Sequence, residues 1–238
     1  MNGILNKKTT KFDIHTHTVA SGHGTTDTVT DLCRRASKIG LDAIGISDHA
    51  PAFPGAAKES YFRSLLKAPK SRFGIDVFYG VELNILNAEG DVDLPDELIS
   101  SLDYAIISLH TKVTKPMSLE DNTNAYIKAM EHPNVRFIGH PDDSSYPIDY
   151  VRLLSEAKKR GVYPEINNAS LMPDAYRKNC RENDRAILSI CKDLSLPVLL
   201  SSDSHGKEHI ANFSYIYPLL TECGFPNSLI LNPVSLSS

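Results

Sequence analysis

The chain has 238 residues, of which 41% are hydrophobic and 23% are charged, as is ordinary for a globular protein with a sizeable core. The formal net charge of -4 leaves no basic excess to neutralise a phosphate backbone, which argues against a nucleic-acid-binding role. No apolar run approaches the roughly 18 residues of a membrane helix, and the opening segment MNGILNKKTT lacks the apolar core of an export signal.

These exclusions favour a cytoplasmic protein that acts away from membranes. The length suits one α/β barrel, so we expect a single domain over residues 1–238. The four cysteines contain no CxxC pair, and this favours a reduced compartment over a disulfide framework.

Apolar segments typical of strands alternate along the chain with amphipathic segments typical of helices. The strand-like segments are KFDIH (11–15), DAIGIS (42–47), DVFYGVEL (76–83), YAIISLH (104–110), VRFIGH (135–140), VYPEIN (162–167) and PVLLSSD (197–203). The helix-like segments are TVTDLCRRASKIG (28–40), NTNAYIKAMEHP (122–133), IDYVRLLSEAKKRG (148–161) and ENDRAILSICKDL (182–194). This alternation predicts βα units around a parallel sheet, and we favour a distorted, TIM-like (β/α)7 barrel.

Two further segments bear on this architecture. The weaker strand-like segment SLILN (228–232) leaves a complete eight-stranded barrel as the second interpretation. The Pro/Gly/Ala-rich segment APAFPGAAKES (50–60) predicts a loop long enough to cover a site.

Six of the seven predicted strands place a candidate metal-binding side chain at or near their carboxyl ends. These residues are His15 and His17, His49, Glu82, His110, His140, and Asp203 with His205, while His23 follows in the first loop. In a βα barrel the carboxyl ends of the strands meet at one face, where active sites are built. We therefore expect these side chains from distant parts of the sequence to converge.

The spacing of the candidates supports a shared ion. His15 and His17 lie two residues apart, as do Asp203 and His205, so each pair lies on one face of an extended chain. Imidazole and carboxylate together suit Zn²⁺, Mn²⁺ or Fe²⁺. The candidates outnumber the ligands of one tetrahedral ion, so we expect two or three ions, with a carboxylate such as Glu82 bridging two of them.

The two other histidines serve as a comparison. His132 precedes a proline at a helix end, and His209 lies in a loop or at a helix start. Since neither ends a predicted strand, we expect both to be structural.

The motifs DIHTHT, ISDH, GVELN, ISLH, IGHP, EINN and SSDSH, in this order, resemble the PHP (polymerase and histidinol phosphatase) family. The resemblance runs from about residue 12 to 232. Chain length and the segments TVASGH and EINNAS are most similar to the small stand-alone bacterial phosphatases of this family, which have a trinuclear metal centre.

The resemblance implies three divalent ions, either zinc or manganese or iron, and a division of the ligands among them. It places the first ion between His15, His17 and Asp203 and the second between His110 and His140, with Glu82 bridging the two; the third lies between His23, His49 and His205. It also suggests a small homo-oligomer.

We expect such a site to hydrolyse a small-molecule phosphate monoester. A hydroxide that bridges the first two metals would attack phosphorus, and the third metal would bind a phosphate oxygen. Glu82, Asp203 and His110 are the predicted catalytic residues.

Several polar residues near the predicted strand ends are candidates for supporting roles. Asp13 and Asp48 are expected either to orient His15 or His49 or to cap strand ends. The candidate phosphate anchors are Arg72, Arg177, Lys112 and Lys115, although solvated surface positions are the favoured interpretation for them. Asn84, Asn167 and Asn168 are candidates for contacting substrate or water, or for forming turns.

Two other functions compete with phosphate ester hydrolysis. An amidohydrolase would cleave C–N or ester bonds on a related barrel, but that superfamily typically places a lysine at a central strand end and lacks a histidine like His23. A non-catalytic metal-binding module is disfavoured by the complete set of ligand candidates. Histidinol phosphate remains one possible substrate of the first interpretation.

Overall fold

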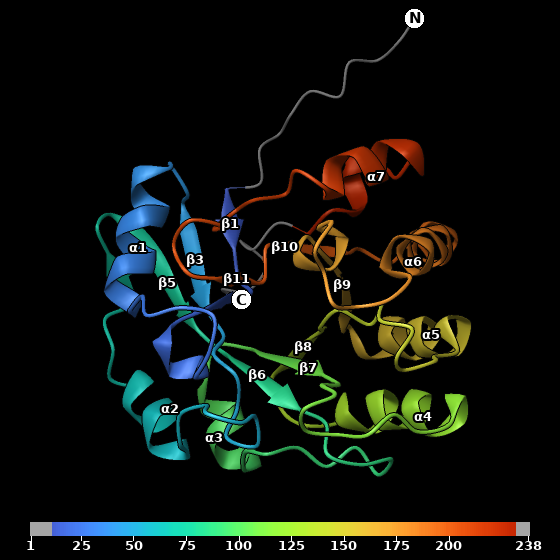
Figure 1. The fold of residues 1–238 in the computed structure, drawn as a ribbon, viewed down its shortest axis with the longest axis horizontal. Helices are drawn as coiled ribbons and strands as arrows, with labels where there is room; N and C mark the ends of the chain where they lie inside the picture. Colours follow the sequence, from blue (N-terminus) through green and yellow to red (C-terminus); the bar gives the residue numbers. More distant parts are fainter. Residues whose placement is uncertain (1–10, 232–238) are drawn as a thin grey trace, which may run out of the picture.

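The computed structural model describes residues 11–231, in which strands gather at the centre and helices surround them (Figure 1). The main strands are β1 (Phe12–Asp13), β3 (Ala43–Ile46), β5 (Ile75–Tyr79), β6 (Val81–Asn84), β7 (Ala105–Ser108), β8 (Val135–Ile138), β9 (Tyr163–Asn167) and β10 (Leu199–Ser201). Each predicted strand segment therefore contains a strand. The segment 76–83 differs from expectation, because it is broken at Gly80 into β5 and β6.

Parallel pairing joins these strands into a ring. β1 pairs with β3 and β3 with β5, while β6 to β10 form a second sheet in consecutive order. A parallel bridge between His49 and Glu82 connects the chain after β3 to β6. At the opposite junction, β2 (Thr16–His17) pairs with β11 (Ser204–His205) and so connects the ends of β1 and β10. The fold is thus the predicted distorted TIM-like barrel.

The weak eighth segment, 228–232, does not form a strand within the described residues, and the ring gains its additional strand from the break at Gly80 instead. Residues 228–231 contribute only the end of a 3-10 helix (Asn227–Leu229) and a single bridge between Ile230 and Val198. Asn232 lies outside the described residues.

The predicted helical segments form α1 (Val29–Lys38), α4 (Leu119–Ala129), α5 (Tyr150–Arg160) and α6 (Cys180–Leu194). Three shorter helices were not predicted: α2 (Glu59–Leu65), α3 (Asp96–Ser101) and α7 (Ile216–Glu222). The expected capping at the start of α1 is confirmed, since the Thr28 and Asp31 side chains each accept from the other's backbone amide. One antiparallel strand, β4 (Ser71–Arg72), pairs with the start of β5.

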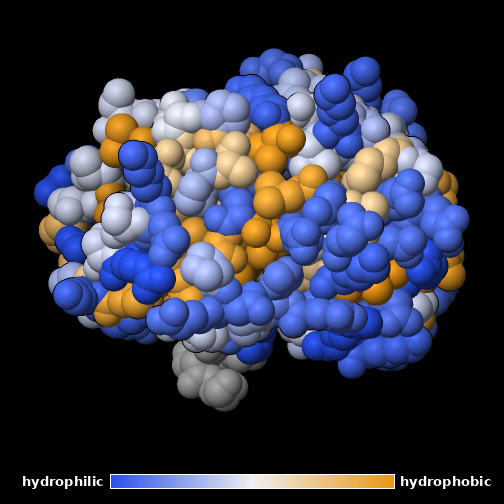
Figure 2. All heavy atoms as spheres, turned by 90° about the horizontal axis from the view of Figure 1, so that it is seen from below, coloured by the Kyte–Doolittle hydropathy of each residue, from blue (hydrophilic) through white to orange (hydrophobic). Residues whose placement is uncertain are grey.

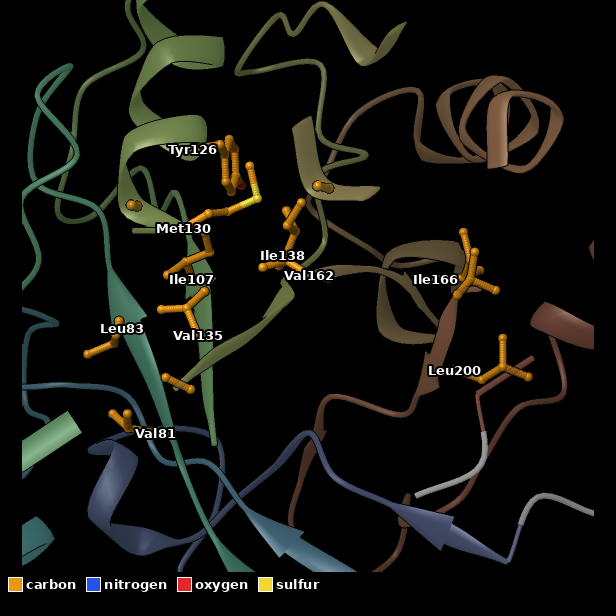
Figure 3. Close-up of a cluster of buried hydrophobic side chains, with 14 of the residues drawn as sticks. Val81, Leu83, Ile107, Tyr126, Met130, Val135, Ile138, Val162, Ile166 and Leu200 are labelled. Carbon is orange, nitrogen blue, oxygen red and sulfur yellow. The ribbon is translucent and has the colours of Figure 1, made fainter. Parts of the chain in front are cut away.

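The apolar core has two parts, one inside the barrel and one between barrel and helices. In the outer part, the strand residues Ile107 and Ile138 lie near Met130, which directly follows α4 (Figure 3). The inner part consists of Phe12, Ile14, Ala43, Tyr104, Ile106, Phe137 and Leu199. Burial of this surface contributes about 25 cal/mol per Å² and stabilises the barrel that carries the site.

Tyr104 fills the middle of the barrel because two glycines leave room for its ring. A Cβ atom added to Gly80 would lie 2.5 Å from the ring, and one added to Gly45 would lie 2.3 Å from the hydroxyl oxygen. The hydroxyl donates a hydrogen bond to the carbonyl oxygen of Ile14. The break between β5 and β6 therefore coincides with a place where only a hydrogen atom fits.

We predict that Gly80→Ala lowers the free energy of unfolding by about 1–3 kcal/mol, because the new methyl group overlaps the Tyr104 ring. Urea denaturation would measure the loss. In a Tyr104→Ala background, which removes the ring, the same substitution should cost much less. An equal loss in both backgrounds would contradict the steric explanation.

Hydrophilic side chains cover most of the face shown in Figure 2, and apolar ones gather towards its middle. Among residues 11–231, no helix combines the length and apolar character needed to cross a bilayer. All four cysteines are free, as expected from their spacing.

Burial should also decide which cysteine reacts. It raises the pKa of Cys33 to about 11 and that of Cys191 to about 12, and the thiolate is the reactive form. We expect iodoacetamide at about pH 8 to modify the half-buried Cys223 well before these two, as followed by mass spectrometry. Equal rates at the three positions would contradict this prediction.

Candidate metal centre

The predicted ligands converge at the carboxyl ends of the strands around one carboxylate, Glu82 of β6. Its Oε1 atom lies 2.9 Å from His140 Nε2 and 3.2 Å from His110 Nε2. Its Oε2 atom lies 2.6 Å from His49 Nδ1. The Nε2 atoms of His15 and His17 follow at 3.5 and 3.6 Å from the two carboxylate oxygens. Glu82 itself is completely buried.

Three groups within this cluster could each hold an ion, since their ligand atoms lie within 4.8 Å of one another. The groups are His15, His17 and Asp203; His49, Glu82 and His110; and His17, His49 and His205. The first is the expected set for the first ion. The other two overlap with the expected sets, and the division of ligands between those ions stays a prediction.

The two predicted ligands outside these groups also lie at the cluster. His140 Nε2 is in contact with Glu82, as described above, and His23 Nε2 lies 3.1 Å from His49 Nε2. The His23 ring also stacks on that of His205, with centroids 4.5 Å apart. The fold thus brings all nine predicted ligands together.

Many of the inward-facing atoms of this cluster lack a hydrogen bond although they are buried. They are the Nε2 atoms of His15, His17, His110 and His205, the Nδ1 atom of His49 and the Oε2 atom of Glu82. The last two lie 2.6 Å apart but lack the angles of a hydrogen bond. Leaving a buried polar atom unpaired costs about 1–3 kcal/mol, so such atoms are rare. Here they gather in one place and are lone-pair donors of the type that bind divalent ions. The residues therefore fit a metal centre.

Three of the histidines form a hydrogen bond through Nδ1 on the side away from the cluster, so their Nε2 atoms face the cluster. The partner of His15 is Glu165 Oε1 at 2.6 Å, and that of His110 is Asn84 Oδ1 at 2.8 Å. Partners of this kind fix the tautomer and the ring orientation of a metal-binding histidine. Asn84 therefore supports a histidine, whereas we expected it to contact substrate or form a turn.

His17 is held by a hydroxyl group. Ser21 Oγ lies 2.8 Å from His17 Nδ1 and donates to the Asp48 carboxylate, so it accepts from the histidine. Asp48 also accepts from Thr18 and from the Tyr61 hydroxyl, at 2.9 and 2.6 Å. The carboxylate therefore acts on His17 through Ser21.

The expectation that Asp13 and Asp48 orient His15 or His49 is wrong. Asp48 makes the bonds just described, and Asp13 accepts from Ser202 and from the amide of Ala211. Sequence reasoning missed Glu165 and Ser21. A glutamate within the apolar segment VYPEIN was the available indication for Glu165, because such a position is buried in a barrel strand.

The environment keeps several of these imidazoles in the neutral form that binds metals. Burial is the main cause that lowers the pKa of His17, His110 and His205. At His15, burial also acts to lower the pKa, but the carboxylates of Glu165, Asp203 and Glu82 outweigh it and raise the pKa. A cation in the cluster would take the place of that proton.

Two candidate ligands have an uncommon backbone conformation. His140 has a φ of 27° and Asp203 a φ of 51°, in the region that favours glycine. The amide of His140 donates to Glu165 Oε2 at 2.7 Å, which holds the residue in place. Such local strain concentrates at functional sites.

The loop 50–60 covers one side of the cluster, as predicted from its composition. The Phe53 ring stacks on His49 and His23 with centroid distances of 4.0 and 4.9 Å. The Lys112 ammonium lies 5.4 Å from the centre of the Phe53 ring. An apolar ring therefore shields the histidines, with a positive charge above it.

The candidate phosphate anchors differ in their positions. The Arg177 side chain is only 7% exposed, contrary to the favoured surface interpretation, and donates to Asp203 Oδ2 at 2.9 Å and to Ser170 at 3.0 Å. Arg72 lies in β4 beside the first residues of β5, at the strand end away from the cluster. Lys112 and Lys115 are exposed, as expected.

The remaining predicted polar residues have structural partners. Asn167 donates to both Glu165 and Asp203, and the Asn168 side chain accepts from the amide of Tyr215. His132 binds Asp96 and the carbonyl oxygen of Gly90, which agrees with the structural role expected for it. His209 is exposed and lies outside the ligand groups.

His23 offers a direct test of the electrostatics. Burial, followed by the charges of His205, His49 and Lys112, lowers its pKa to about 4, so protonation is disfavoured. We expect the His23 imidazole of metal-free protein to stay neutral at about pH 5.5, where an ordinary histidine is mostly charged. An NMR titration of the ring would check this, and a midpoint near 6.5 would contradict it.

Comparison with known proteins agrees with this geometry. Residues 13–169 match the profile of the PHP domain. A protein of Clostridium acetobutylicum named "probable phosphatase" is 40% identical over 92% of this chain and 89% of its own length. One of Caldicellulosiruptor saccharolyticus with the same name is 39% identical over 92% of this chain and 90% of its own.

Among solved structures, the fold is similar to that of histidinol phosphate phosphatase from Lactococcus lactis, which was determined with zinc, L-histidinol and phosphate. The TM-score is 0.62 at 19% identity, and the match covers 91% of this chain and 95% of the other. At this identity the similarity supports the fold.

Proposed function

The chain belongs to the PHP domain family, and on that premise we propose that it is a phosphatase that hydrolyses small phosphate monoesters with divalent metal ions. The relatives named probable phosphatases cover nearly the whole chain. The observation that carries the proposal is the group of buried, unpaired nitrogen and oxygen atoms that face one another around Glu82.

The proposed ligands divide into three sets. His15, His17 and Asp203 would hold the first ion, His110 and His140 the second with Glu82 shared between them, and His23, His49 and His205 the third. Zinc fits the nitrogen-rich donors, as do manganese and iron, and the similar structure from Lactococcus lactis contains zinc. When bound, such ions lower the pKa of water to about 7 and stabilise the negative charge on a phosphoryl group.

The residues of the chain add charge and shape to that chemistry. Arg177 is fixed against Asp203 and Ser170, and its guanidinium places a positive charge beside the first group of ligands. The Phe53 ring stacks on the His49 and His23 rings and covers them from one side. A phosphate group would thereby bind in a site whose polar groups are already oriented.

A hollow of about 630 Å³ lies beside His205, one of the proposed ligands, and would suit a polar part of the substrate. Its lining consists of Gly24, Thr25, Thr26, Asp27, His205, Gly206, Lys207, Glu208 and His209, without an aliphatic or aromatic hydrocarbon side chain. Groups of this kind favour a hydrogen-bonding alcohol as the leaving group over an apolar one.

Hydrolysis of p-nitrophenyl phosphate by the purified protein tests the proposal. Protein stripped by a chelator should be inactive, and resupply of Mn²⁺ or Zn²⁺ should restore phosphate release. Activity only on an ester or amide panel would favour the amidohydrolase interpretation. Metal binding without turnover on either panel would favour a non-catalytic module.

Substitution at the shared carboxylate should remove the activity. We predict that Glu82→Ala and His110→Ala each reduce turnover to the level of the metal-free protein, because each removes a ligand atom at the centre of the cluster. His132→Ala, whose side chain binds Asp96 away from the cluster, should retain activity near that of the parent protein. Circular dichroism would confirm folding, and full activity of either ligand variant would contradict the proposed site.

A further inference from the structure

Glu165 of β9 is a buried carboxylate outside the set of proposed ligands, and only 1% of its surface is exposed. Its Oε1 atom bonds to His15 Nδ1 at 2.6 Å and accepts from the Ser201 hydroxyl. Its Oε2 atom accepts from the amide of His140 at 2.7 Å and from Asn167 Nδ2 at 3.0 Å. When Nε2 of His15 is free to bind a metal, the proton of the ring is on Nδ1, and His15 donates to Glu165. All four partners of Glu165 are then hydrogen-bond donors.

These bonds reach two different parts of the proposed centre. The bond to His15 turns Nε2 towards Glu82 and Asp203, at 3.5 and 3.7 Å. The bond to the His140 amide holds a residue with a φ of 27°, whose Nε2 contacts Glu82 at 2.9 Å. Glu165 is therefore a common partner of a ligand from the first set and a ligand from the second.

A third connection runs through Asn167. Its amide nitrogen donates to Glu165 and also to Asp203 Oδ2, at 3.0 and 3.2 Å. Asp203 has a φ of 51°, so this bond also holds a residue in an uncommon conformation. By contrast, the hydrogen bonds of Glu165 do not extend to His23, His49 or His205 of the third set.

We propose that Glu165 is a positioning residue that sets the affinity of the first two metal sites together and leaves the third unaffected. This inference rests on the proposed function, because it assumes that the cluster binds metal ions. Loss of such an outer partner typically costs about 10–100-fold in metal affinity.

A carboxylate is required at position 165 because both of its oxygen atoms can accept hydrogen bonds. A glutamine has nearly the same shape, but one of its two terminal atoms is an NH2 group. In either orientation that group would face two donors, either His15 and Ser201 or His140 and Asn167. Glu165→Gln therefore disturbs the bonds with little change in volume.

The test compares metal binding by wild type, Glu165→Gln and Asp184→Asn. Asp184 is a matched control, since it is also completely buried, but its oxygens lack a hydrogen bond and it lies in α6. Each protein would be loaded with zinc and titrated with a chelator, and the zinc remaining bound would be measured by mass spectrometry. We expect Glu165→Gln to release two ions at about 10–100-fold lower chelator strength while retaining one, and the control to resemble wild type.

The outcomes separate this inference from the proposed function. A wild type that binds neither zinc nor manganese nor iron would refute the metal-dependent function itself. Zinc-binding wild type with an unchanged Glu165→Gln profile would overturn only the role of Glu165. Equal weakening of all the ions would also overturn it, because a general loss of structure would explain that result.

A second variant tests the same connection in case Glu165→Gln does not fold. Asn167→Ala removes one donor to Glu165 and to Asp203 without placing a new polar group beside them. We expect it to weaken the same two ions to a smaller extent. Zinc release identical to that of wild type would contradict the proposed connection.

Discussion

The burial of Glu82 is the constraint on which the rest of the site depends. A carboxylate without exposed surface requires compensating charge or hydrogen bonds, because its transfer out of water costs several kcal/mol. Burial acts to raise its pKa, but the imidazoles of His110, His49 and His15 outweigh that effect and hold the pKa well below its usual range. That effect requires positive charge on the imidazoles, and metal ions bound between the carboxylate and their nitrogens would supply it in place of protons.

The hydrogen-bond partners of the histidine Nδ1 atoms differ in charge. His15 has the carboxylate of Glu165 behind it, His110 the neutral amide of Asn84, and His17 the hydroxyl of Ser21. A charged acceptor raises the basicity of a ligand more than a neutral one does. The proposed first and second ions would therefore bind to histidines of unequal strength, although both share Glu82.

Much of the site was predictable because strand ends and the two-residue period are visible in the sequence. The convergence of His15 with Asp203 follows from the rule that parallel strands end at one face. The partners behind the ligands were not predictable, since Glu165 lies within an apolar strand segment and Ser21 in a short helix. The break at Gly80 was missed because it depends on the Tyr104 ring, which lies far away in the sequence.

Closure of the barrel and assembly of the site depend on the same contact. β2 and β11 are only two residues each, and their register pairs His17 directly with His205. The two rings stack with centroids 4.2 Å apart, which brings the first and third ligand sets together. Two such short strands contribute few hydrogen bonds to the junction. Ions bound by these histidines would stabilise the folded state, and that stabilisation would grow with the logarithm of the free metal concentration. The proposed metals would therefore link the two ends of the barrel at a junction where the strands themselves contribute little.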